Sequence, residues 1–323
     1  MTAWLVHRIM QSLLVVIAMT AIVFVAVNVI GDPVAILISP DANQAERDRI
    51  IVQFGLDQPL WRQYLSFVGG AVRGDFGNSF VYGMPALQVI FQRMPATLEL
   101  ALGTLVVSVA FGIPLGLYTG MQPNSFLSKL TLSASILGFS VPVFWLGLIL
   151  IMFFSVYLGW FPAGGRGETV RVFGVGLSFL TLDGLRHLTL PVLTLAIFKI
   201  SLVLRMVRAG VRDVVPQEYV KFARAKGLSK QRILFVHILK NIMIPVVTIV
   251  GLEFGSLIAF SVVTESIFAW PGMGKLIIDS INVLDRPMIV AYLMIIVFLF
   301  VAINLVVDIL YTLLDPRARL TGP

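Results

Sequence analysis

The sequence predicts an all-α, polytopic membrane protein with six transmembrane helices. Hydrophobic residues make up 58% of the 323 residues, and the charged residues Asp, Glu, Lys and Arg make up only 13%, against roughly 25% in soluble domains. The mean hydropathy of +0.94 excludes a soluble globular fold. The absence of cysteine excludes disulfides, thiolate nucleophiles and Cys-ligated zinc sites.

Six apolar stretches are each long enough to cross a bilayer as a helix, which takes about 20 residues. Their length and their content of Leu, Ala and Met favour helices over barrel strands, which would alternate over about 10 residues. The first stretch is longer than the core of a signal peptide and no cleavage site ends it, so we expect an uncleaved span. The expected spans cover residues 9–30, 97–120, 130–158, 188–207, 242–268 and 288–310.

The distribution of charge between the loops predicts the orientation of the chain. With six spans, both termini share one side with the loop around Lys129 and the loop 205–240. That side carries 13 basic and three acidic residues, and nine of these basic residues lie in 205–240; the opposite side carries ten of each. Because basic residues concentrate in cytoplasmic loops, we expect the N- and C-termini in the cytoplasm.

This topology divides the chain into four parts. We expect a cytoplasmic N-terminus and first span over 1–30, an outer segment over 31–96, a core of five spans over 97–313 that includes the cytoplasmic loop 208–241, and a cytoplasmic tail over 314–323. The outer segment is too long for a plain hairpin, and Asp41 and Pro59 can each begin a helix there. Such helices either lie on the bilayer or dock a partner, and the composition leaves both alternatives open.

Small residues inside the expected spans predict close helix packing, and prolines there predict bends. Glycines at four-residue spacing lie on one helix face and let two backbones approach closely, as ordinary bundle packing requires. Pro142 and Pro245 are expected to kink their helices beside a translocation path, because proline removes a backbone donor. The glycines concerned are Gly112, Gly116, Gly120, Gly251 and Gly255.

Two ionisable residues lie deep inside expected spans. An ionisable group at that depth is costly and usually faces a bundle interior or a cavity. We therefore take Lys199 and Glu253, together with Pro142, as candidate residues of a translocation path. Two alternatives stay open for the charged residues: a structural ion pair, and the proton relay of a proton-coupled secondary transporter.

The sequence contains no recognisable enzyme motif. The histidines His7, His187 and His237 lie in different loops or at span ends and form no H-E-x-x-H zinc site. The segment Gly-Met-Gly-Lys at 272–275 lacks the flanking residues of a phosphate-binding loop. We therefore expect no catalytic residue, no metal site and no cofactor bound by this chain, and no nucleic-acid partner.

The loop 208–241 predicts a short amphipathic helix, followed by a second helix that leads into the fifth span. Pro216 suits the first turn, Glu218 complements the helix N-terminus and Gly227 suits the position after the last turn. Aromatic residues on one side and basic residues on the other are typical of a helix that docks into a groove on a partner. The positive-inside bias is the alternative explanation for the basic residues alone. The expected shared face consists of Tyr219, Phe222 and Ala223.

The same loop contains Ala-Arg-Ala-Lys-Gly-Leu at 223–228, followed by His-Ile-Leu-Lys-Asn at 237–241 and Ile-Pro-Val-Val-Thr at 244–248. Shorter distinctive segments lie at 31–33, 55–60, 63–65, 74–77, 95–100, 264–268, 270–274 and 304–308. In their order and spacing, these segments together resemble the dipeptide/oligopeptide/nickel family of ABC importer permeases. Within that family the chain is most similar to subunits like dipeptide permease B, and the resemblance extends nearly from end to end.

In this resemblance the loop corresponds to the EAA motif, whose general pattern is E-A-A-x3-G-x9-I-x-L-P. Only Ala223, Gly227 and Leu239 agree with that pattern, and the departures match the variant of peptide permeases. A second departure is Leu-Asp-Arg-Pro at 284–287, where relatives tend to show Arg-Asp-x-Pro. The resemblance assigns the ATPase-coupling element to Glu218, Tyr219, Phe222, Ala223, Arg224, Ala225, Lys226, Gly227 and Leu228, with salt bridges at its rim from Arg224 and Lys226.

The resemblance also implies the type I (MetI-like) ABC importer permease fold and a subunit without enzymatic activity of its own. The partners it implies are a second homologous permease subunit in a heterodimer, two cytoplasmic ATPase subunits that hold ATP and Mg, and an extracytoplasmic solute-binding protein. It implies a bacterial inner membrane as the surrounding bilayer. We expect residues 41–80 to contact the binding protein.

The expected substrates are di- and oligopeptides. Nickel complexes, glutathione-like compounds and small oligosaccharides stay as alternatives, because in such importers the binding protein does most of the selecting. Two alternatives from other classes also stay open: a proton-coupled secondary transporter, and a non-transporting membrane scaffold or receptor.

Overall fold

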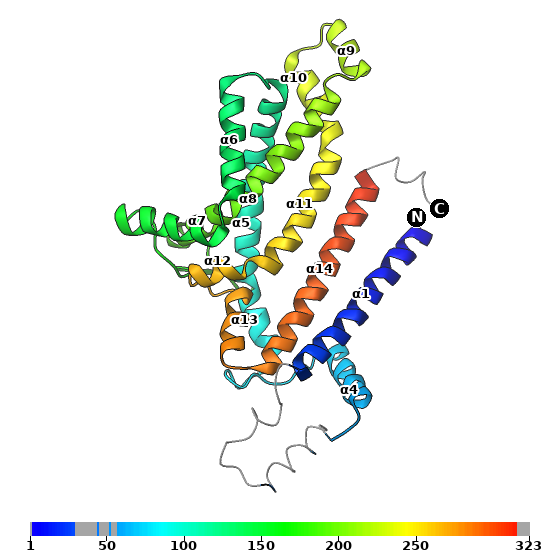
Figure 1. The fold of residues 1–323 in the computed structure, drawn as a ribbon, viewed down its shortest axis with the longest axis vertical. Helices are drawn as coiled ribbons and strands as arrows, with labels where there is room; N and C mark the ends of the chain where they lie inside the picture. Colours follow the sequence, from blue (N-terminus) through cyan, green and yellow to red (C-terminus); the bar gives the residue numbers. More distant parts are fainter. Residues whose placement is uncertain (1, 30–43, 45–51, 53–56, 315–323) are drawn as a thin grey trace. The chain divides into compact units, whose positions relative to one another are not determined.

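The structure is a computed structural model that describes residues 2–29, 44, 52 and 57–314. Within these residues nearly all regular structure is helical (Figure 1). The chain forms two compact units: Met1–Met94 with Leu276–Ala302, and Pro95–Lys275 with Ile303–Pro323. The helix expected after Asp41 and most of the expected C-terminal tail lie outside the described residues.

In the first unit a short helix packs against the N-terminal span. The span is α1 (Thr2–Val29), and α4 (Leu60–Val72) begins directly after Pro59, as predicted. The ring of Tyr64 on α4 lies edge-on against Phe24 of α1, with 5.4 Å between ring centroids. The Tyr64 hydroxyl lies 2.8 Å from the Thr20 hydroxyl of α1. Aromatic packing and one hydrogen bond therefore fix α4 beside the C-terminal part of α1.

A buried carboxylate organises the remainder of this unit. Asp285, in the segment that departs from the family pattern, is fully buried. It accepts hydrogen bonds from the Ser79 hydroxyl and from the backbone N–H groups of Phe80 (3.3 Å) and Val81 (3.4 Å). The departure at 284–287 therefore keeps an aspartate that closes a loop inside the chain.

The second unit contains the bundle. Its helices begin with α5 (Ala86–Met121), α6 (Phe126–Ser140), α7 (Val143–Leu150), the π-helix η1 (Ile151–Tyr157) and α8 (Leu182–Val214). The short α9 (Glu218–Ala225) follows α8. A continuous rod comes next, formed by α10 (Lys230–Arg232), the π-helix η2 (Ile233–Leu239) and α11 (Lys240–Phe260). The chain continues through α12 (Val262–Ile267). Most of α13 (Met273–Asn282) belongs to the first unit, and α14 (Arg286–Leu314) is divided between the units after Ala302.

Five helices in the described residues are long and apolar enough to cross a membrane, and each overlaps a predicted span. The sixth predicted span corresponds to α6 followed by α7 and η1, which pass the same test as a pair and are bent by 104°. The five candidates formed by a single helical segment are Val6–Ala26, Ala86–Met121, Leu182–Val214, Lys230–Phe260 and Arg286–Leu310.

Two of the predicted spans were expected to be longer continuous helices than they are. The expected span 130–158 breaks before Pro142, because proline disfavours the helical conformation of the preceding residue, and Val141 is extended at φ −80° and ψ 128°. The expected span 242–268 ends at Phe260, before the separate α12. Helix α11 runs through Pro245 without a break, so the bend near Pro142 is the pronounced one.

A stripe of glycines brings α5 and α8 into close contact, as the four-residue spacing predicts. A Cβ atom built on Gly112, Gly116 or Gly120 would lie 2.6–2.8 Å from a valine side chain of α8, closer than real Cβ contacts allow. The two backbones can therefore approach only because this face of α5 carries no side chains. The facing valines are Val203, Val207 and Val211.

One element of the second unit is not helical and was not predicted. Strands β1 (Val170–Val172) and β2 (Val175–Leu177) form an antiparallel hairpin. Its turn consists of Phe173 and Gly174, both with positive φ (51° and 83°), which suits a tight two-residue hairpin turn. Three-residue strands produce too little alternation for a sequence pattern to reveal them.

Candidate functional site

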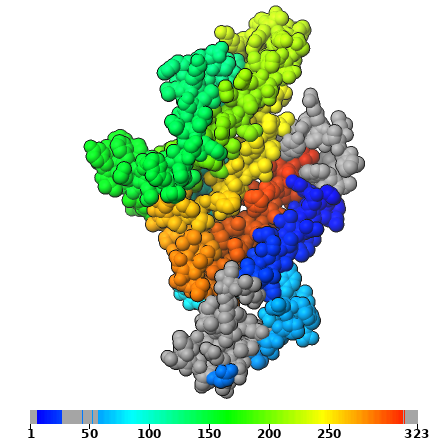
Figure 2. Space-filling view, viewed as in Figure 1, coloured from blue at the N-terminus to red at the C-terminus, as the bar shows by residue number. Residues whose placement is uncertain are grey.

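The short helix α9 lies at one end of the second unit, beyond the ends of α8 and α10 (Figures 1 and 2). Gln217 is the N-cap residue, so the first turn begins at Glu218, two residues later than the expected position of Pro216. Gly227 has φ +73° and follows the C-cap residue Lys226, as predicted for a helix stop. The Leu228 N–H donates to the Ala223 carbonyl (3.2 Å), which closes the end of the helix.

The two sides of α9 differ in burial. Val220 (0% exposed) and Ala223 (3%) pack into a cluster of aliphatic side chains from α5, α8, η2 and α11. Tyr219 and Phe222 remain 42% and 61% exposed. The predicted common face is therefore divided: Ala223 seats the helix on the bundle, and the two aromatic rings point out of it.

The charged residues of α9 are all exposed, and two of them have partners on the same helix. Lys221 forms a 2.8 Å ion pair with Glu218. The ammonium group of Lys226 lies 4.5 Å from the centroid of the Phe222 ring. Arg224 and Ala225 are exposed as well, whereas Leu228 is partly buried against the aliphatic cluster. The outer surface of α9 thus combines two aromatic rings with several cations.

The structure brings Lys199 and Glu253 together inside the bundle. The Lys199 ammonium on α8 contacts Oε2 of Glu253 on α11 and donates to the Ser256 hydroxyl at 3.2 Å. The same Oε2 accepts a hydrogen bond from the Ser256 hydroxyl at 3.0 Å. This geometry supports the ion-pair alternative, since the carboxylate is paired with a cation and with a neighbouring hydroxyl.

A cavity of about 300 Å³ adjoins this pair. Lys199 and Ser256 line it directly, and so does Val143, the first residue of the helix that Pro142 caps. Of the three residues expected along a translocation path, Lys199 lines the cavity, Glu253 contacts Lys199, and Pro142 directly precedes the lining residue Val143. Most of the remaining lining is apolar, with the phenylalanines Phe144, Phe198 and Phe260.

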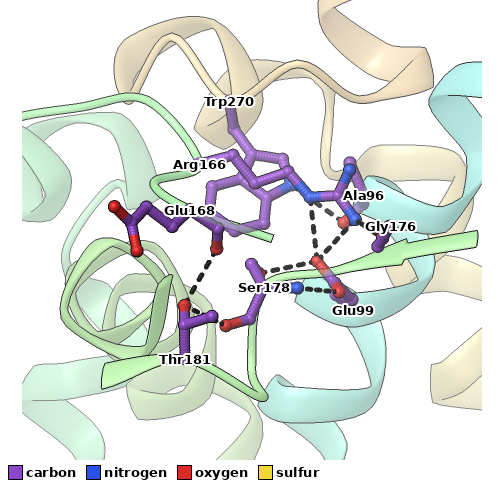
Figure 3. A network of polar contacts seen from close by, with 8 residues as sticks. All are labelled: Ala96, Glu99, Arg166, Glu168, Gly176, Ser178, Thr181 and Trp270. Carbon is purple, nitrogen blue, oxygen red and sulfur yellow. Dashed lines mark hydrogen bonds and ion pairs between the residues drawn. The ribbon is translucent and has the colours of Figure 1, made fainter. Parts of the chain in front are cut away.

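A polar network that the sequence analysis did not anticipate holds the hairpin loop against α5 (Figure 3). Glu99 accepts a hydrogen bond from Arg166 Nε at 3.0 Å, from the Ser178 N–H at 2.7 Å and from the Ser178 hydroxyl at 2.8 Å. The Arg166 guanidinium also donates to the Gly176 carbonyl at 2.6 Å. Both charged side chains are largely buried, so this is a buried ion pair that holds the loop in place and not a surface salt bridge.

A second buried carboxylate, Glu265 on α12, organises the turn that follows it. It accepts hydrogen bonds from the hydroxyls of Thr97 (2.8 Å) and Ser261 (2.9 Å) and from the Lys275 N–H (3.0 Å). Burial raises the pKa of the Glu265 carboxyl above its usual range, although these donors oppose the shift. A Cβ atom on Gly274 would lie 2.9 Å from this carboxylate. The segment 272–275 therefore wraps a carboxylate of its own chain, which explains its glycines without any bound phosphate.

The bundle of apolar spans, the short exposed helix between two of them and the ion pair inside the bundle suit the membrane component of a transport system. The family "Binding-protein-dependent transport system inner membrane component" matches residues 112–320, and its N-terminal counterpart matches residues 1–101. The chain belongs to this family.

Two relatives match over almost the whole chain. The oligopeptide transport system permease protein AppB of Bacillus subtilis (strain 168) is 40% identical over 319 residues, which cover 98% of this chain and 99% of the relative. The glutathione transport system permease protein GsiC of Escherichia coli (strain K12) is 36% identical over 320 residues, 99% of each chain. The chain is therefore a permease subunit of an ABC importer, a non-catalytic membrane component that works with a binding protein, and the resemblance found in the sequence is confirmed.

A solved structure supports the same fold. The methionine ABC transporter MetNI in its inward-facing conformation matches with a TM-score of 0.53 over 71% of this chain and 97% of that chain, at 16% sequence identity. The predicted all-α, MetI-like permease fold is thereby confirmed. The family also removes the two alternatives from other classes, the proton-coupled transporter and the scaffold.

Proposed function

We propose that this chain is the peptide-translocating permease subunit of an ATP-driven importer in the bacterial inner membrane, with both termini in the cytoplasm. The observation that carries the proposal is α9, a helix that is buried on one side by its own bundle and leaves Tyr219 and Phe222 exposed on the other. Exposed aromatic rings on a firmly seated short helix are typical of a segment that fills a groove on a partner.

The position of α9 in the chain suits the transmission of force. It follows α8 and precedes the rod that ends in α11, and both are candidate membrane spans. A partner that binds α9 and then moves can therefore displace α8 and α11 as rigid bodies. We assign this partner to two cytoplasmic ATPase subunits that hold ATP and Mg, with Glu218–Leu228 as the coupling element. Nine basic residues in 205–240 support the cytoplasmic side for α9.

The other end of α8 lies on the opposite side of the bilayer in this arrangement, because α8 itself crosses it. We place the extracytoplasmic solute-binding protein there and retain residues 41–80 as its contact, together with the hairpin 170–177. A second, homologous permease subunit completes the pathway as a heterodimer. In support of this, Phe144 and Phe260 beside the cavity are 51% and 77% exposed in the single chain.

Peptides are the substrates that we propose. The relative from Bacillus subtilis is named for oligopeptides and the one from Escherichia coli for glutathione, which is itself a tripeptide. Both names point to compounds built from amide-linked amino acids. Nickel complexes and oligosaccharides have no such support among these relatives.

The test is ATP hydrolysis by the importer, reconstituted with its binding protein and a dipeptide. Phe222→Ser should abolish the stimulation of ATP hydrolysis by the loaded binding protein, because the ring that enters the ATPase groove is lost. Phe222→Tyr keeps the aromatic ring and is the matched control, expected to stay close to wild type. Undiminished stimulation in Phe222→Ser, with the complex intact, would remove the coupling role from α9.

A further inference from the structure

The ion pair between Lys199 and Glu253 uses only part of the hydrogen-bonding capacity of its two charged groups. Both recorded contacts of the Glu253 carboxylate involve Oε2, and within the described residues Oε1 accepts no hydrogen bond. The Lys199 ammonium has three donors and uses two of them, toward Glu253 and Ser256. One carboxylate oxygen and one N–H of the ammonium group therefore have no hydrogen-bond partner among the described residues.

The pair is also not sealed inside the bundle. The side chain of Lys199 is 15% exposed and that of Glu253 is 25% exposed, and Lys199 lines the adjoining cavity. An ion pair that serves only to join two helices repays its desolvation cost only when hydrogen bonds satisfy its remaining donors and acceptors. Here the ammonium group of Lys199 borders the cavity with one donor unused, and the Glu253 carboxylate contacts that ammonium group.

The cavity itself has the properties of a small-molecule site. Its volume of about 300 Å³ lies at the lower end of the range for such sites. Phe144, Phe198 and Phe260 contribute aromatic walls, and Lys199 and Ser256 are polar groups at the boundary. An apolar chamber with a few polar groups on one side takes ligands that have an apolar part and a charged part.

We propose that Lys199 and Glu253 bind the two charged ends of a short zwitterionic peptide during its passage, while the phenylalanines receive its side chains. This inference rests on the proposed function and specifies the substrate as a peptide with a free ammonium group and a free carboxylate. The ammonium group is taken by Glu253 and the carboxylate by Lys199. Without ligand the two residues neutralise each other, so the empty pathway contains no uncompensated buried charge.

An exchange of ion-pair partners explains how a ligand can enter and leave such a site. A zwitterion brings one positive and one negative charge, so every charge still has an opposite partner after the ligand enters. Lys199 and Glu253 each exchange their mutual ion pair for an ion pair with the ligand, so the net binding free energy stays small. Weak binding suits a transport path, because a ligand must leave the site as readily as it enters.

The experiment measures the pathway separately from the binding protein. The double variant Lys199→Met/Glu253→Leu replaces the pair by apolar residues of similar length, which leaves no unpaired charge and so preserves the fold. Thr248→Val on the same helix removes a hydroxyl that is bonded only to its own helix and does not line the cavity, and it is the control. In proteoliposomes that contain the full importer, uptake of alanyl-phenylalanine should fall by about tenfold or more in the double variant.

Stimulation of ATP hydrolysis by the loaded binding protein should persist in the same variant, since α9 and the outer surface are unchanged. Normal uptake by the double variant would overturn the inference and leave the proposed function intact. Absence of ATP-driven peptide uptake in the wild-type importer would instead refute the proposed function itself.

A second measurement covers the case in which the double variant is unstable. Saturation-transfer NMR on the wild-type complex in nanodiscs, without binding protein, should detect contact with alanyl-phenylalanine. The doubly blocked analogue N-acetyl-alanyl-phenylalanine amide should give a signal at least about tenfold weaker, because it offers no charge to either residue. Equal signals from the two compounds would show that the charges do not select the ligand, and the inference would fall.

Discussion

Because α5 and α8 are in close contact, we expect that adding a single methyl group between them, as in Gly116→Ala, lowers the free energy of unfolding. In Gly116→Ala, the new Cβ atom would lie 2.6 Å from the Val207 Cβ and 2.8 Å from the Leu204 carbonyl oxygen. Ordinary contacts begin at 3.4 Å, so the helices must separate by about 0.8 Å. The carbonyl belongs to the backbone of a long helix and cannot rotate away as a flexible side chain would.

The energetic cost follows from that separation. A gap of about 0.5–1 Å removes a quarter to a half of the dispersion energy of the atom pairs across it. Insertion of one methyl group into a tightly packed contact typically costs about 1–3 kcal/mol. The alanine also gains about 1 kcal/mol of helix propensity, which offsets the loss only in part.

A matched substitution isolates the packing effect. Gly69 lies in helix α4, and a Cβ atom there would meet no other atom within 4 Å. Gly69→Ala carries the same gain in propensity without the steric cost. The free energies of unfolding of the two variants, measured by denaturation in SDS–detergent mixtures, should therefore differ by about 1–3 kcal/mol, with Gly116→Ala the less stable. Equal stabilities would refute the view that the glycine stripe sets the distance between the helices.

Three further predictions concern the coupling loop and the two buried carboxylates. Gly227→Trp should abolish transport but not membrane insertion. The residue has φ +73°, and a Trp side chain would fill the open space that the proposed ATPase contact at this residue requires; wild-type uptake would contradict this. Arg166→Met leaves Glu99 buried without its cation and should lower the unfolding free energy by about 3–5 kcal/mol, measured by thermal denaturation of the purified complex. The double variant Glu99→Gln/Arg166→Met should recover part of that loss, and no recovery would argue against the pair. Glu265→Gln offers one acceptor oxygen instead of two to its donors and should cost about 1–3 kcal/mol in the same assay, so an unchanged melting temperature would speak against this role.

Hydropathy revealed the spans because it depends only on local composition. Pro142 predicted a kink, but the extent of the bend was not predicted, because the hydropathy of the apolar run from 130 to 158 does not register a change of direction. The end of α11 at Phe260 was missed for the same reason, because the apolar run continues past it.

Contacts between distant residues had no local signal. Lys199 and Glu253 are 54 positions apart, and Glu99 and Arg166 are 67 apart. Lys199 and Glu253 could be recognised as unusual charges, but only the fold decides which charges meet. In the same way, helical periodicity placed Ala223 and Tyr219 on one face of the helix. In the structure Ala223 is buried against the bundle and Tyr219 is exposed, which periodicity alone does not predict.

The 104° bend has a consequence for the bilayer around this subunit. Helix α6 has 15 residues and is therefore about 22 Å long, which is shorter than the roughly 30 Å hydrocarbon core that it must match. The following α7 and η1 turn aside instead of extending it. Lipids beside α6 must thin locally to cover it.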